Sequence, residues 1–197
     1  MNLEQLHPYL PDSAEFFVEK WISPYPLTLK ITRSRQTKLG DYRKLRPQNR
    51  HQITVNGDLN PEAFFFVLTH EIAHMIIYAQ YKYGDVAPHG KEWKFIFGEL
   101  LKESVRIYTS ANQPYILKHA NAPKASVGAD SDISRYLIND LSSTQDYLED
   151  LEIGSTFLLS KKIFIKGEKR KLRYICCEVK TKKNYLINAT ALVEKIN

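Results

Sequence analysis

Residues 60–80 read NPEAFFFVLTHEIAHMIIYAQ, and this stretch decides how the chain folds. Asn60 can cap a helix N-terminus, and Pro61 suits the first helical position, where no N–H is needed. Apolar side chains surround the helix on almost every side, which is typical of a central, buried helix. Gly84 can end it. The stretch therefore predicts a long helix in the core of the fold.

Two histidines and a glutamate interrupt this apolar helix. His70 and His74 are four residues apart and lie on one helix face, so both imidazoles can reach one ion. Zinc accepts imidazole nitrogen in tetrahedral coordination. Glu71 can reach a water on the metal and act as general base without being a ligand. Unpaired polar groups on a buried helix cost free energy, so the pattern favours one Zn²⁺ per chain.

A catalytic zinc needs a third protein ligand and an open position. His89 is the candidate, because it follows a short loop at 84–88 and precedes a second helix that is expected to start near Gly90. Gly90 would allow close backbone approach at that turn. Glu92 and Glu99 remain alternatives, since a glutamate from a second helix can also bind zinc. The remaining histidines are expected at the surface or in structural roles: His7, His51 and His119.

The segment before the long helix predicts one helix and a small antiparallel sheet. Residues 12–21 carry apolar side chains at helical spacing. Residues 27–32 and 51–56 alternate apolar and polar side chains, which is typical of half-buried strands. Residues 39–42 supply turn residues between them.

The C-terminal half predicts a linker and a β module. From 120 to 132 the composition turns to Ala, Pro, Ser, Gly and Asp, so residues 120–154 are interpreted as a linker with a short helix. Short β-like runs follow at 156–159, 162–166, 171–179 and 184–188. The expected organisation is a catalytic domain over 1–119, the linker, and a small β module over 155–197. The fold class is α+β.

The positive charge is unevenly distributed. The chain carries a formal charge of +6. Residues 155–197 hold 11 Lys or Arg against 3 Glu, a net of +8, whereas the remainder holds 17 against 19, a net of −2. A polyanion is therefore expected to bind the β module.

At this point the chain resembles the SprT-like family, which includes bacterial SprT proteins and the eukaryotic Spartan DNA–protein crosslink proteases. The resemblance rests on residues 39–42, on the strand at 52–55, on the helix with His70 and His74, and on His-Gly-Lys-Glu-Trp at 89–93. It covers about residues 10–119. It implies a zincin-like peptidase domain in which His70, His74 and His89 bind zinc and Glu71 is the catalytic base.

The chain departs from the family at its C-terminus. Many bacterial members end in a zinc ribbon with paired cysteines, whereas here the only cysteines are Cys176 and Cys177. Two adjacent thiols cannot make a four-ligand site. The tail is therefore interpreted as a degenerate, metal-free counterpart of that ribbon, with the cysteines in core packing.

The densest basic run of the tail is Lys169, Arg170, Lys171 and Arg173. Three aromatic residues are interleaved with this module: Phe164, Tyr174 and Tyr185. Positive charge beside exposed aromatic rings is the combination that binds single-stranded nucleic acid. The alternative is that the lysines protect strand edges and the aromatics belong to the core.

Three functions fit the sequence. The first is a zinc metallopeptidase acting on DNA-bound or crosslinked proteins, with single-stranded DNA as a second partner. The second is a dedicated protease of one regulatory protein. The third is a nucleic-acid-binding protein with structural zinc and no peptidase activity, which the intact Glu71 argues against. Short apolar runs, adjacent cysteines and the absence of a signal pattern predict a cytoplasmic protein without a membrane partner.

Overall fold

The computed structural model describes residues 3–35, 37–45, 50–81, 86–138 and 145–196, so Gly84 lies outside the described residues. Helices and strands are mixed, as the expected α+β class requires. The chain divides into two units, Met1–Ala125 and Ser126–Asn197.

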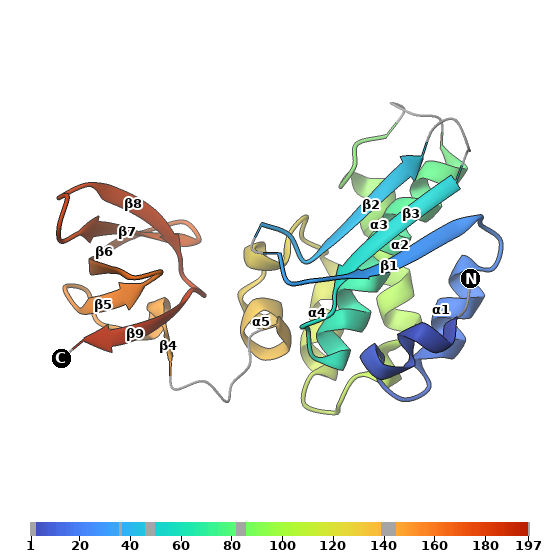
Figure 1. The fold of residues 1–197 in the computed structure, drawn as a ribbon, viewed down its shortest axis with the longest axis horizontal. Helices are drawn as coiled ribbons and strands as arrows, with labels where there is room; N and C mark the ends of the chain where they lie inside the picture. The colour runs from blue at the N-terminus through green and yellow to red at the C-terminus, as the bar shows by residue number, and fades with distance from the viewer. Residues whose placement is uncertain (1–2, 36, 46–49, 82–85, 139–144, 197) are drawn as a thin grey trace. The chain divides into compact units, whose positions relative to one another are not determined.

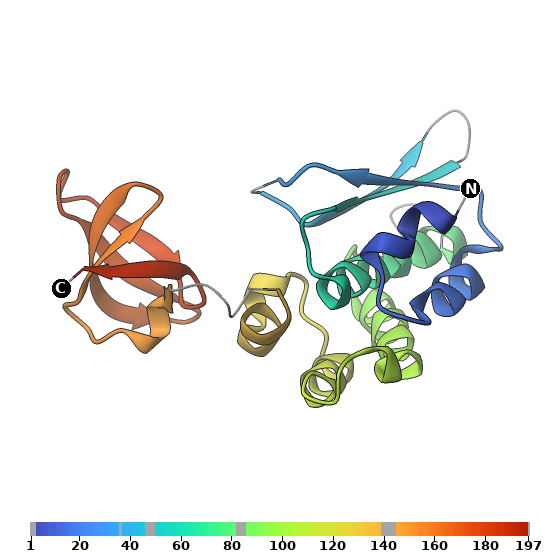
Figure 2. The same ribbon diagram turned by 60° about the horizontal axis from the view of Figure 1, so that its bottom comes forward.

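In its described residues, the first unit packs four α-helices and two short 3-10 helices with one three-stranded sheet (Figure 1). Its helices are η1 (Leu3–Tyr9), α1 (Ala14–Ile22), α2 (Pro61–Gln80), α3 (Lys91–Glu103), η2 (Val105–Ile107) and α4 (Gln113–Asn121). Its strands are β1 (Leu27–Thr32), β2 (Gly40–Leu45) and β3 (Arg50–Asn56). Figure 2 shows the sheet on one side of the helices.

Helix α2 is the centre of this unit, as the sequence predicts. The Asn60 side chain accepts a hydrogen bond from the Ala63 N–H at 2.9 Å, which caps the helix. Phe65 stacks on Trp21 of α1, and Phe66 contacts Phe97 of α3 edge-on. The helix is long and apolar enough to cross a membrane, but 72% of its apolar window is buried inside the unit, which identifies it as a core helix.

The sheet is mixed rather than antiparallel, which corrects the prediction. β3 lies in the middle, antiparallel to β2 and parallel to β1. The chain passes from β1 to the far edge and returns through β3, so β1 and β3 run in the same direction. The expected turn at 39–42 instead begins β2. Gly40 is a close-approach glycine, because a Cβ there would lie 2.7 Å from Val67.

The second unit is a curled antiparallel sheet with short helical segments (Figure 1). The helical segments are η3 (Val127–Ala129), α5 (Ser131–Ile133), η4 (Ser134–Ile138) and η5 (Leu148–Asp150). The strands are β4 (Asp146–Tyr147), β5 (Thr156–Leu159), β6 (Lys162–Arg170), β7 (Arg173–Glu178), β8 (Asn184–Asn188) and β9 (Leu192–Ile196), in the order β4-β9-β5-β6-β7-β8. The runs at 156–159 and 184–188 are confirmed; β4 and β9 were not predicted.

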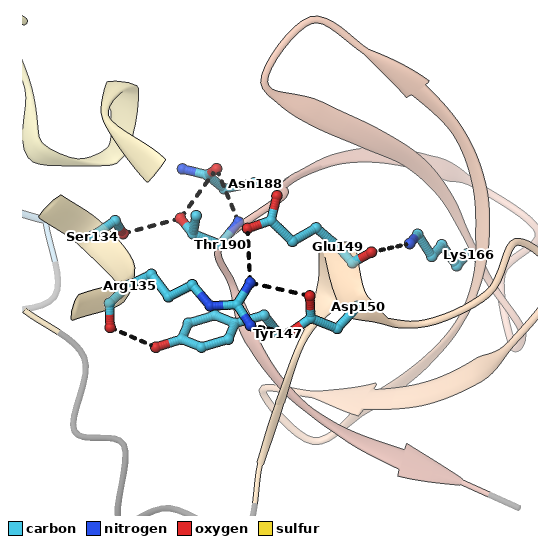
Figure 3. Close-up of polar contacts among 8 residues, drawn as sticks. All are labelled: Ser134, Arg135, Tyr147, Glu149, Asp150, Lys166, Asn188 and Thr190. Carbon is cyan, nitrogen blue, oxygen red and sulfur yellow. Dashed lines mark hydrogen bonds and ion pairs between the residues drawn. The ribbon is translucent and has the colours of Figure 1, made fainter. Parts of the chain in front are cut away.

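Residues 126–154, interpreted from composition as part of a linker, belong to this second unit (Figure 3). The Arg135 guanidinium donates to both carboxylate oxygens of Asp150, at 3.1 and 2.7 Å. The hydroxyls of Ser134 and Thr190 lie 3.0 Å apart. The buried Lys166 ammonium donates to the carbonyl of Leu151 at 2.5 Å. The small polar residues of this segment make caps and hydrogen bonds, so they do not form a free linker.

This boundary changes the distribution of charge. Residues 126–154 carry seven acidic side chains against Arg135 alone. The second unit therefore holds 12 basic and 10 acidic residues, a net of +2, and the first holds 16 and 12, a net of +4. The net charge of +8 therefore belongs to residues 155–197, and the acidic residues of 126–154 reduce it to +2 for the whole unit.

Two truncations test the boundary. A chain ending at Ala125 should unfold cooperatively, because its core is complete without the second unit. A chain ending at Gly154 should carry a protease-sensitive, aggregation-prone tail, because Leu148 and Leu151 lose the sheet that buries them. Thermal unfolding and limited proteolysis measure both effects. If the chain ending at Ala125 fails to fold and the chain ending at Gly154 folds, residues 126–154 belong to the first unit.

Candidate metal centre

Three histidine rings converge at the centre of the first unit. The Nε2 atom of His74 lies 3.3 Å from that of His70 and 3.0 Å from that of His89. The third separation, between His89 and His70, is 3.4 Å. Two nitrogens bound tetrahedrally to zinc at about 2.0–2.1 Å are roughly 3.3–3.4 Å apart. The three rings therefore have the spacing of ligands that can hold one metal ion.

Burial keeps these rings in the form that binds metals. Burial, and after it the neighbouring histidines, lower the pKa of His70 to about 2 and that of His74 to about 4. Burial also lowers the pKa of His89. The imidazoles are therefore neutral at pH 7, with lone pairs free for a cation.

A tight turn before α3 brings His89 to the other two histidines. The Gly90 N–H donates to the Ala87 carbonyl at 2.9 Å, and the Gly90 carbonyl accepts the first hydrogen bond of α3. A Cβ on Gly90 would lie 3.2 Å from the Ala87 oxygen, so a side chain there would be crowded. Glu92 and Glu99 lie outside the described metal-binding group; Glu92 pairs with Lys91, and Glu99 accepts from Lys102.

Aromatic rings hold the histidines in place. The fully buried Trp93 ring centroid lies 4.7 Å from His70, 5.2 Å from His74 and 4.7 Å from His89. On its other side His74 stacks nearly parallel to Tyr42, at 6.4 Å and 11°. Sequence analysis used Trp93 only as part of the His-Gly-Lys-Glu-Trp motif and gave it no role beside the histidines. Its position in the first turn of α3, four residues after His89, was the signal for that role.

Glu71 lines the same cleft and is held by strand β2. It is 7% exposed, and burial, followed by the nearby Asp41 charge, raises the pKa of its carboxyl to about 8. The Tyr42 backbone N–H donates to this carboxylate. A Cβ on Gly40 would lie 2.6 Å from the Glu71 Oε1 atom. The glycine therefore lets β2 run close enough to fix the orientation of the glutamate.

The cleft has a volume of about 410 Å³ and lies between β2 residues 40–44, helix α2 and the turn at 88–89. Its wall includes Tyr42, whose hydroxyl lies 2.9 Å from Nδ1 of His51. Burial raises the pKa of Tyr42 and lowers that of His51, so a neutral hydroxyl and a neutral imidazole share this hydrogen bond. His51 thus anchors the ring that supports His74.

The other two histidines are structural or superficial. The His119 ring is 2% exposed and packs edge-on against Phe66 and Phe97. His7 is exposed and contacts the carboxylate of Glu15 at 2.9 Å. Neither belongs to the metal-binding group of the described residues.

The basic run lies in the second unit, at the hairpin between β6 and β7. Lys169, Arg170, Lys171 and Arg173 are all exposed. For two of the interleaved aromatic rings the structure bears out the core alternative: Phe164 is 4% and Tyr174 8% exposed, and both belong to the core, because alternate residues of β6 and β7 face inward. Only Tyr185, at 38%, is exposed.

The two cysteines pack in the second unit. Cys176 is fully buried in the core and Cys177 is half-buried, and both are free thiols. Among the described residues, the only group that can hold a metal is the three histidines of the first unit.

Comparisons with known proteins agree on one family. Residues 15–112 match the SprT-like family. Protein SprT of Yersinia pestis is 50% identical over 36 residues, 18% of this chain and 20% of that protein. Protein SprT of Pectobacterium carotovorum is 46% identical over 44 residues, 22% of this chain and 25% of that protein. The matched segments thus span only a fifth to a quarter of these relatives. No solved structure matches the chain significantly.

Replacing any ligand should abolish metal binding. His70→Ala, His74→Ala and His89→Ala should each lose the roughly one equivalent of zinc that the parent retains, because two imidazoles leave the tetrahedron incomplete. Metal analysis after dialysis measures this, with exposed His7→Ala as the control. In a Trp21→Phe background, Trp93 emission should report zinc binding, since Trp21 and Trp93 are the only tryptophans. Full occupancy in His89→Ala would point to Glu92 or Glu99.

Proposed function

Because the chain belongs to the SprT-like family and its three histidines converge beside a buried glutamate, we propose that it is a zinc-dependent metallopeptidase. The observation that carries the proposal is the set of three Nε2 separations of 3.0–3.4 Å. His70, His74 and His89 would supply three protein ligands, which is the number found at catalytic rather than structural zinc. The zincin-like assignment of the first unit is part of this proposal.

The chain's own residues then have distinct roles. His70, His74 and His89 would hold a zinc ion, which would supply Lewis-acid activation of water and of the scissile carbonyl. Glu71 accepts a proton from the attacking water on its carboxylate and delivers it to the leaving amine. The Tyr42 N–H and the close approach of Gly40 hold that carboxylate in one orientation. Trp93 and Tyr42 hold His74 from both sides.

The proposed substrate is a protein or peptide bound in extended conformation. β2 is an edge strand in the described sheet, paired only with β3, and it forms one wall of the cleft. A peptide can add to such an edge through main-chain hydrogen bonds, which brings its carbonyls past the metal centre. This mode of binding fits a peptidase better than a nucleic-acid-binding protein with structural zinc.

We further propose that the substrates include DNA-bound or crosslinked proteins, with single-stranded DNA contacting the β6–β7 hairpin. The exposed hairpin is dense in positive charge, and it lies in a unit without the metal centre. Phosphates contact such charges regardless of base sequence. Buried Phe164 and Tyr174 leave few rings for base stacking, so phosphate contacts would dominate. The alternative is a dedicated protease whose second unit recognises one regulatory protein.

Glu71→Gln should retain zinc and fold but lose hydrolysis of a casein-type substrate by at least about a hundredfold, because the amide cannot accept the proton. Proteolysis assays with and without single-stranded DNA, together with metal analysis, measure both properties. Glu92→Gln is the matched control, because Glu92 is a glutamate in the first turn of α3 and lies outside the metal-binding group and the cleft lining. Wild-type hydrolysis by Glu71→Gln would show that Glu71 is not the base.

Neutralising the hairpin should weaken single-stranded DNA binding. Replacing Lys169, Arg170, Lys171 and Arg173 by Gln should reduce the slope of log affinity against log salt by about 3, because four phosphate contacts are lost. The control removes four exposed lysines at the opposite end of the strands: Lys161, Lys180, Lys182 and Lys183. Equal losses in the two variants would exclude a localised hairpin site. Absence of DNA binding by the parent would favour the dedicated-protease alternative.

A further inference from the structure

Strand β8 is an exposed edge without the usual protection. Residues 184–188 read NYLIN, with no charge and no proline. In the described sheet, β8 pairs with β7 on one side only. The other described edges carry charges: Lys30 in β1, Asp41 in β2, and Asp146 in the two-residue β4. Native proteins commonly use charges, prolines or bulges to stop an edge from pairing with another chain, and β8 has none of these.

The hydrogen-bonding groups of β8 show which residues face outward. The Ala189 N–H donates to the Leu172 carbonyl, and the Lys183 carbonyl accepts from the Glu178 N–H. Antiparallel strands alternate, so the main-chain groups of Asn184, Leu186 and Asn188 point away from β7. The Asn188 carbonyl accepts from Ala191. Among the described residues, the N–H groups of all three residues and the carbonyls of Asn184 and Leu186 therefore lie at the open edge, where the Asn188 side chain donates to the Gly128 carbonyl at 3.1 Å.

An aliphatic surface leads up to this edge. On the outer face of the sheet Leu186 is paired with Ile175, and Ile165 with Cys177. Leu186 is 48%, Ile165 39% and Ile163 43% exposed. Because these side chains occupy one face of neighbouring strands, they form a continuous apolar band that ends at β8. A further strand beside β8 could extend the band with apolar side chains of its own.

Positive charge flanks both ends of β8. The turn before it carries exposed Lys180, Lys182 and Lys183, and the hairpin beyond its other end carries Lys171 and Arg173. A second copy pairing antiparallel would bring each basic turn beside the other copy's basic hairpin, and like charges oppose such pairing. An acidic strand would instead be attracted at both ends. Nucleic acid would use the charges but neither the main-chain groups nor the aliphatic band.

We propose that β8 is the docking edge for an extended, acidic segment of a protein partner, which adds to the sheet as a further strand. Its main chain pairs with Asn184, Leu186 and Asn188. Its aliphatic side chains continue the band at Leu186, and its carboxylates meet the basic ends. This surface would recruit a protein to the second unit, independently of whether the first unit hydrolyses it.

Fluorescence anisotropy of a labelled peptide tests the proposal. Every protein measured is the full chain carrying Glu71→Gln, so that the peptide probe is not hydrolysed. The probe is a ten-residue peptide that alternates Glu with Val or Ile. Leu186→Pro should weaken its binding about tenfold, because proline removes one outward N–H and no β7–β8 hydrogen bond. Leu186→Val keeps both the amide and an aliphatic side chain and should bind like the parent.

Amide hydrogen exchange provides a second readout that does not depend on the proline variant folding. The peptide should slow exchange at Leu186 and Asn188, while Tyr185 and Ile187 are already protected by β7. Unchanged exchange at Leu186 and Asn188 overturns the proposal, as does no binding at about 1 mM peptide. So does equal binding of poly-glutamate, which lacks aliphatic side chains. Protection of the same amides by oligo-dT would reassign the surface to nucleic acid.

Discussion

The first unit depends on the convergence of three imidazole nitrogens on a helix that is otherwise apolar. Helix α2 is buried on nearly all sides, so polar groups on it need partners inside the unit. A metal ion shared by His70 and His74 would need a third protein ligand. The turn at Gly90 brings His89 into that position. Trp93 packs against all three histidine rings. This contact fixes the planes of the rings and excludes water from that side.

The perturbed pKa values around the centre have a common origin. Burial lowers the pKa of His70 and raises that of Glu71, so it disfavours positive charge on the first and negative charge on the second. The lone pairs of neutral imidazoles are stabilised by a cation that binds them. A buried glutamate ionises only when positive charge lies nearby. A bound dication satisfies both requirements at once. The geometry of β2 serves the same end, since Gly40 and Tyr42 hold the carboxylate at the cleft.

Local signals made the convergence of the three histidines predictable from sequence, whereas features that depend on distant parts of the chain were not predicted. The Asn60 cap, the four-residue spacing of His70 and His74 and the His89-Gly90 turn act over a few residues each. Gly40 resembled a turn residue because its role, close approach to Val67, depends on a helix more than 20 residues away. The parallel pairing of β1 with β3 likewise follows from the path of the chain. Strand β9 was missed because its burial depends on β5 and β4.

The second unit shows why composition alone misplaced a boundary. Its acidic segment, residues 126–154, looked like a linker, yet Lys166 and Thr190 bond it to the rest of the unit, and Arg135 pairs with Asp150 within it. With this segment included, the net charge of the unit is only +2, so long-range attraction for a polyanion is weak. Attraction must then act at short range, where exposed lysines and arginines gather at the ends of the strands. Short-range charge beside an open, apolar strand edge favours a ligand that also has a main chain to pair, and a peptide meets that condition.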